Sequence, residues 1–132
     1  SAFENCSSLQ RVTLHEGLKE IRGAAFKNNT QLAYIELPNS LEYLGGSAFS
    51  HCSSIVDITI PQNVIEINGQ TFEYCTSLRS INLHDNIISI HGEVFVGDRN
   101  LETIVLPSKI TEIRGNTFDY LILDEAAFYK ED

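Results

Sequence analysis

Residues 47–69 read SAFSHCSSIVDITIPQNVIEING, and this pattern recurs along the whole chain of 132 residues. Phenylalanine and glycine each return at one fixed interval, and no gap is needed in the alignment. The phenylalanine column comprises Phe3, Phe26, Phe49, Phe72, Phe95 and Phe118. A fixed period of roughly 20–50 residues predicts a repeat architecture, in which each unit packs on its neighbours. We therefore divide a single domain, 1–132, into units 1–23, 24–46, 47–69, 70–92 and 93–115 and a partial, irregular unit 116–132.

Each unit contains one stretch in which apolar and polar residues alternate. Val12-Thr13-Leu14 and Ile35-Glu36-Leu37 are two examples. Alternation with β-branched residues predicts a short strand with one face turned inward. Proline follows the stretch in three units, as Pro38 does, and a residue without an N–H ends the strand there. The strands of successive units are expected to form one parallel sheet.

The segment before each strand has a different spacing. Its inward positions lie three residues apart, as in Phe49, Cys52 and Ile55. This spacing predicts a single helical or 3₁₀ turn on the side opposite the sheet. A unit this short cannot bury its own apolar side, whereas stacked copies bury it against each other. The last unit departs from the pattern, because Asp124 occupies the position of a leucine.

Composition narrows the class of protein. Apolar residues make up 42% of the chain, which excludes an intrinsically disordered segment. No apolar run approaches the roughly 18–20 residues of a membrane-spanning helix, so we expect no membrane insertion. The formal charge of −9 makes nucleic acid an unsuitable partner, because phosphates would be repelled. The chain begins at Ser1 without a leader, so we expect a fragment or a processed product.

The sequence contains no motif of a known catalytic chemistry, and we expect no enzyme activity, cofactor or metal. Cys6, Cys52 and Cys75 share one column and are expected to be small buried side chains. Cys52 and Cys75 stand in adjacent units, close enough to leave a disulfide open as an alternative. The histidines and carboxylates are spread over separate columns or alternate units, which favours a solvated surface.

Two further features leave alternatives open. Asn5 and Asn28 each begin an Asn-x-Ser/Thr sequence, which is either a glycosylation site in a secreted eukaryotic protein or a chance occurrence. Ile65 and Ile88 are neighbours in one outward column near Tyr43. They form either an exposed contact surface or a patch packed under a neighbouring loop.

The full pattern resembles the BspA-like, or Treponema-type, leucine-rich repeat family. Ala48-Phe49, Cys52, Ile60-Pro61 and Gly69 match that pattern within one unit. The resemblance covers 1–115 fully and 116–121 weakly. It implies an α/β horseshoe, with a parallel sheet on the concave face and short helical turns on the convex side. The resemblance also implies a surface-exposed or secreted protein linked to adhesion and protein binding.

The outward strand positions are free of packing constraints and vary in kind, so we expect a binding surface there. Its two columns are Arg11, Tyr34, Asp57, Ser80 and Thr103, and Thr13, Glu36, Thr59, Asn82 and Val105. The expected function is a non-enzymatic interaction or adhesion module for a protein or glycan. The alternatives are a structural spacer, or the repeat domain of a protein whose catalytic domain lies elsewhere. Self-association through the open ends of the stack is a further expectation.

Overall fold

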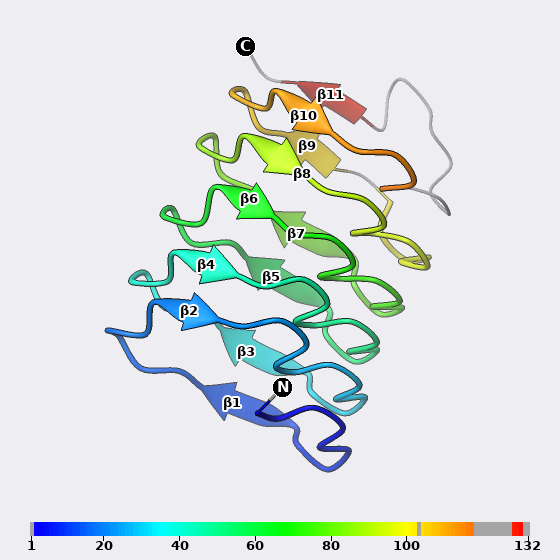
Figure 1. Cartoon of the computed structure of the whole chain (residues 1–132). Coiled ribbons are helices and arrows are strands. Elements are labelled where there is room, and N and C mark those ends of the chain that lie inside the picture. Colours follow the sequence, from blue (N-terminus) through cyan, green and yellow to red (C-terminus); the bar gives the residue numbers. More distant parts are fainter. Residues whose placement is uncertain (1, 103, 118–127, 131–132) are drawn as a thin grey trace.

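The computed structural model describes residues 2–102, 104–117 and 128–130, which form a rod of stacked coils (Figure 1). Each complete coil contains a three-residue strand and a two-residue strand. The three-residue strands are β1 (Arg11–Thr13), β3 (Tyr34–Glu36), β5 (Asp57–Thr59), β7 (Ser80–Asn82), β9 (Ile104–Leu106) and β11 (Phe128–Lys130). The two-residue strands are β2 (Glu20–Ile21), β4 (Tyr43–Leu44), β6 (Glu66–Ile67), β8 (Ser89–Ile90) and β10 (Glu112–Ile113).

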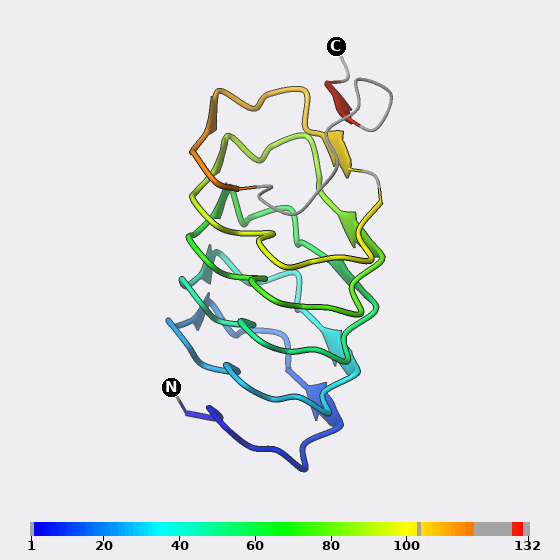
Figure 2. The same ribbon diagram turned by 90° about the vertical axis from the view of Figure 1, so that its right-hand side faces the viewer.

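All of the described strand pairs are parallel, as the sequence predicts. Val12 lies opposite Ile35 and Ile58 opposite Ile81, so equivalent residues of successive units are in register. β1 pairs with β3, β5 with β7, and β9 with β11, while β2 pairs with β4 and β8 lies between β6 and β10. Figure 2 shows the two series of strands on separate sides of the stack. The predicted parallel solenoid is confirmed.

The predicted helical or 3₁₀ turns are wrong, because the described residues contain no helix. The backbone instead alternates in conformation around each phenylalanine. Ala24 and Asn28 have positive φ angles of 58° and 64°, and their equivalents in the following units repeat this conformation. Residues with positive φ interrupt a right-handed helical path.

The hydrogen bonds of this segment explain why the turn does not become a helix. The N–H groups of Ala25 and Lys27 donate locally along the chain, to the carbonyls of Arg22 and Ala24 three residues earlier. The intervening Phe26 N–H donates to the Ala48 carbonyl of the next unit at 2.8 Å. Every second N–H therefore joins two coils. We call this segment, residues 24–29 and its equivalents, the turn side.

The core is a continuous column of aromatic rings and aliphatic side chains. The rings of Phe3, Phe26, Phe49, Phe72 and Phe95 stack in order, with centroids 5.4–6.2 Å apart and planes within 7° of parallel. The three rings from Phe49 to Phe95 are completely buried. Phe118, the sixth member of the column, lies outside the described residues. The stacking predicted for the other five rings is confirmed.

The sixth unit contributes one described strand, β11, which continues the sheet beyond β9. Phe128 lies opposite Ile104, whereas an exact repeat would place residue 127 there. The register therefore shifts by one position between these strands. This shift agrees with the irregularity predicted for 116–132, while Asp124 itself lies outside the described residues.

Candidate functional site

The predicted binding residues form the outward side of the three-residue strands, which we call the strand face. Arg11 lies opposite Tyr34, and Thr13 lies opposite Glu36, on the paired strands β1 and β3. The same two columns continue as Asp57, Thr59, Ser80, Asn82 and Val105, and all of these residues are exposed. Thr103 lies outside the described residues. Exposure of the others agrees with the sequence analysis, and their role in binding stays a prediction.

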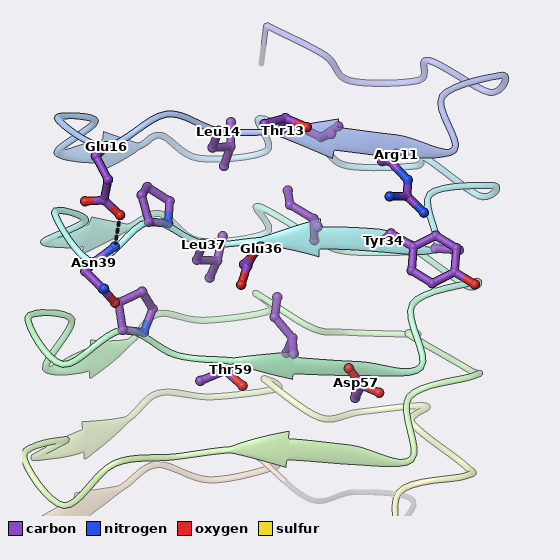
Figure 3. Close-up of a pocket in the computed structure, with 16 residues that line it drawn as sticks. Arg11, Thr13, Leu14, Glu16, Tyr34, Glu36, Leu37, Asn39, Asp57 and Thr59 are labelled. Carbon is purple, nitrogen blue, oxygen red and sulfur yellow. Dashed lines mark hydrogen bonds between the residues drawn. The ribbon is translucent and has the colours of Figure 1, made fainter.

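A hollow of about 720 Å³ lies on the strand face across β1, β3 and β5 (Figure 3). Polar side chains on its lining include Arg11, Glu36 and Asp57, and the apolar part includes Leu37. The hollow brings together strand-face residues of three units, and the strand register pairs those of β1 and β3 directly.

Glu16 and Asn39 also line this hollow, and sequence reasoning missed both of them. They lie in the turns that follow β1 and β3, where Figure 3 shows Glu16 beside Asn39. The Asn39 N–H donates to Glu16 Oε1 at 2.9 Å, and the Ser40 N–H donates to Oε2 at 3.2 Å. The sequence did contain a signal for this contact, because Glu16 and Asn39 occupy equivalent positions in successive units.

Tyr34 is the most exposed of the large apolar and aromatic residues of the described chain, with 64% of its surface accessible. The Arg11 Cζ lies 4.8 Å from the centroid of its ring, within the range of a cation–π interaction. A second hollow of about 390 Å³ is lined in part by Gln10 and Ser54. Arg11 and Tyr34 line both hollows. The Tyr34 ring is therefore held by Arg11 at the border of two hollows.

The charges around the first hollow are unbalanced. Its lining contains the carboxylates of Glu16, Glu36 and Asp57 and the single cation Arg11. Glu16 accepts two backbone N–H groups, as described above. Within the described part of the chain, Glu36 and Asp57 form no side-chain hydrogen bond or ion pair. Two exposed carboxylates beside an exposed aromatic ring can bind a cationic group.

The remaining candidates do not form a chemical centre. Among the described residues, no group of three or more His, Cys, Asp or Glu side chains could hold a metal ion. Cys6, Cys52 and Cys75 are free thiols, so the structure contains the thiol alternative and not the bridge. Burial raises the pKa of Cys52 to about 12, which leaves it protonated and unreactive. The carboxylates of Glu20 and Glu112 pair with Arg22 and Arg114 on the surface.

The structure also shows where the two Asn-x-Ser/Thr sequences and the two outward isoleucines lie. Asn28 donates its side-chain amide to Asn5 Oδ1 at 2.8 Å, so the two sequons are adjacent on the turn side. Ile65 and Ile88 are 46% and 38% exposed, and Tyr43 is 45% exposed. No loop of the described part of the chain therefore covers these isoleucines. None of the described segments is a helix long and apolar enough to cross a bilayer.

Comparison with known proteins identifies the repeat. The chain matches the BspA-type leucine-rich repeat region in six copies over residues 1–124. No curated protein sequence matches it significantly. Among solved structures, a leucine-rich cell surface protein from Faecalibacterium prausnitzii A2-165 has a TM-score of 0.85 and 32% identity, covering 98% of this chain and 35% of that protein.

Two further bacterial structures show the same likeness. The leucine-rich repeat protein of T. pallidum has a TM-score of 0.78 and 30% identity, over 83% of this chain and 54% of that protein. A leucine-rich repeat protein from Bacteroides ovatus ATCC 8483 has a TM-score of 0.77 and 29% identity, over 83% of this chain and 30% of that protein. This chain thus spans at most about half the length of the three proteins. The regular period, the stacked parallel strands and the match over 1–124 together show that the chain belongs to the BspA-type leucine-rich repeat family.

Proposed function

We propose that the chain is a non-catalytic recognition module, displayed at a cell surface or secreted, that binds a protein through its strand face. The observation that carries the proposal is the Arg11–Tyr34 pair at the border of the 720 Å³ hollow. Tyrosine and arginine are frequent hot-spot residues in protein interfaces. A ring held in place on a rigid sheet loses little conformational entropy when a partner binds. The surface location is supported by the relative described as a cell surface protein.

A protein partner is favoured over a glycan by the charges of the hollow. Glu36 and Asp57 have no partner among the described residues, and the chain as a whole carries a charge of −9. Lysine or arginine side chains of a partner would pair with these carboxylates, and one of them could stack on Tyr34. A neutral sugar would leave both carboxylates without a counter-charge. We therefore propose a partner segment that is basic.

Binding to synthetic peptide arrays tests this proposal. We expect the wild-type chain to bind lysine- and arginine-containing peptides, and not the same peptides with aspartate or glutamate in those positions. Binding should weaken as salt is added, because exposed charges are screened. Tyr34→Ala should cost about 2 kcal/mol or more in binding free energy, as hot-spot substitutions do. Asp57→Asn should weaken binding to the basic peptides in the same direction.

Tyr43→Ala is the matched control, because Tyr43 is an exposed tyrosine outside the lining of the hollow. It should leave peptide binding unchanged. Equal binding by the wild-type and Tyr34→Ala chains would contradict the strand-face proposal. Binding confined to a neutral oligosaccharide array would favour a glycan partner, and binding to neither array would favour a structural spacer.

A further inference from the structure

One inward column of the repeat carries a hydrogen-bond donor in successive units. Asn29 donates its side-chain amide to the carbonyl of Phe3 at 2.7 Å. The thiol of Cys52 lies 3.1 Å from the Phe26 carbonyl, and that of Cys75 lies 3.2 Å from the Phe49 carbonyl. The side chain at this position therefore reaches back to the phenylalanine carbonyl of the preceding unit.

Asp98 occupies the same position in the fifth unit and is completely buried. Its Oδ1 accepts the Cys75 N–H at 2.8 Å, while its Oδ2 is buried without a partner. The acceptor that the repeat places before it is the carbonyl of Phe72, in the preceding unit. The nitrogen of the same Cys75 N–H lies 3.2 Å from that carbonyl oxygen. The Phe72 carbonyl and Asp98 Oδ1 therefore both accept from one N–H group. An ionised carboxylate has no proton to donate, whereas a carboxylic acid has one.

We infer that Asp98 is a neutral carboxylic acid in the folded chain, whose Oδ2–H donates to the Phe72 carbonyl, and that losing this proton destabilises the fifth unit. The proton makes Asp98 equivalent to the thiols of Cys52 and Cys75 in the units below. The stability of the fifth unit therefore depends on pH through a side chain that solvent does not reach in the folded state.

The surroundings of Asp98 support the neutral form. The pKa of Asp98 is raised from 3.8 to about 9, mainly by burial; the Cys75 N–H lowers it in part, and the negative charge of Glu73 adds to the rise. The Cys75 thiol faces it from the fourth unit, and burial raises the pKa of that thiol as well. Asp98 has no ion pair with the described residues. On the turn side of the sixth unit, the described residues are Asn116 and Thr117, and neither of them titrates.

The direction of the pH dependence follows from this raised pKa. Unfolded chains lose the Asp98 proton near pH 4, and the folded chain keeps it to about pH 9. The stabilisation is fully present below pH 4 and is lost as the pH rises through this window. One retained proton changes the unfolding equilibrium constant by about tenfold per pH unit. Above about pH 9 both states are ionised and the effect becomes constant.

Chemical unfolding of the full chain at several pH values tests the inference. Asp98→Asn replaces the acid proton with an amide N–H, the donor that Asn29 already uses in the second unit. Between pH 5 and pH 8, the ratio of wild-type to variant unfolding constants should rise by about a thousandfold, the product of three tenfold steps. Glu102→Gln is the control, because Glu102 is an exposed acid of the same unit. The ratio of wild-type to Glu102→Gln unfolding constants should change far less over the same pH range.

Infrared spectroscopy provides an independent measurement. The folded wild-type chain at pH 7 should show the C=O band of a protonated carboxyl group, and Asp98→Asn should lack that band. Parallel pH profiles for the wild-type and Asp98→Asn chains would overturn the inference. So would the absence of the protonated-carboxyl band from the wild-type spectrum at neutral pH.

Discussion

The turn side and the strand face use the same repeat in opposite ways. On the turn side, the second to fifth units bury the same phenylalanine, and alternate N–H groups such as that of Phe26 donate to the next coil. On the strand face, equivalent positions carry different side chains, such as Arg11, Tyr34 and Asp57, and all three are exposed. The difference indicates that the turn side holds the stack together. The strand face is free of this packing constraint, and its side chains vary from unit to unit.

The largest expected effect comes from removing a ring from the turn side. Phe49→Ala should lower the free energy of unfolding by about 3–5 kcal/mol, because removing this buried ring leaves a cavity between the rings of Phe26 and Phe72. Urea unfolding would measure this loss. Phe3→Ala is the control in the same column, where the ring is 48% exposed and should cost roughly half as much. Equal losses at the two sites would contradict a stack held by its buried rings.

A second test concerns a place where the backbones of two coils lie close together. A Cβ atom at Gly45 would lie 2.4 Å from the backbone nitrogen of Gly23, so Gly45→Ala must push the first two units apart. We expect a loss of about 1–3 kcal/mol in the free energy of unfolding, typical of overpacking. At Gly115 a Cβ atom would meet no described atom within 4 Å. Gly115→Ala should therefore change the melting temperature little, and a loss as large as that at Gly45 would refute the steric explanation.

The alternating backbone of the turn side predicts opposite outcomes for two neighbouring alanines. Ala24 has a positive φ of 58°, whereas Ala25 does not. Ala24→Gly should stabilise the chain by about 0.5–1 kcal/mol, because glycine adopts this conformation without steric cost. Ala25→Gly should destabilise it by a similar amount. Thermal unfolding of the two variants would measure the difference, and a change of the same sign in both would contradict the alternation.

The smallest effect on stability is expected on the strand face. Tyr34→Ala should change the free energy of unfolding by less than about 0.5 kcal/mol, because most of the side chain is already in water. The same variant is expected to lose binding to basic peptides. Calorimetric unfolding would test the first statement. A loss of stability comparable to that of Phe49→Ala would show that the two sides do not divide the roles in this way.

The sequence predicted the three-residue strands and the stacked core because both depend on the identity of side chains. It did not predict the second series of two-residue strands. It did not predict the backbone of the turn side. A spacing of three residues is shared by a helical turn and by a path that alternates between right- and left-handed residues. Asn28 adopts positive φ readily, but Ala24, Ser47 and Glu93 carry no preference for it. Their conformation follows from the hydrogen bonds that the turn side makes to the next coil.

The sequence likewise predicted one part of the candidate site and not another. Alternation along each strand identified Arg11, Tyr34, Glu36 and Asp57 as outward residues, and the structure places all four beside one hollow. The cation–π contact of Arg11 with Tyr34 and the hydrogen bonds of Glu16 were not predicted. Both depend on how closely successive coils approach, which the pattern of a single unit does not contain.

By itself, the sequence determined the period, the parallel strands and the columns that face inward, because repeated apolar side chains can be buried only by stacking. The tertiary structure alone decided three further features. These are the hydrogen bonding of the turn side, the hollow beside Tyr34, and the burial of Asp98 against the Cys75 N–H. The physical reason is that each depends on contacts between residues of different units, whose distances are set by the packing of one coil on the next.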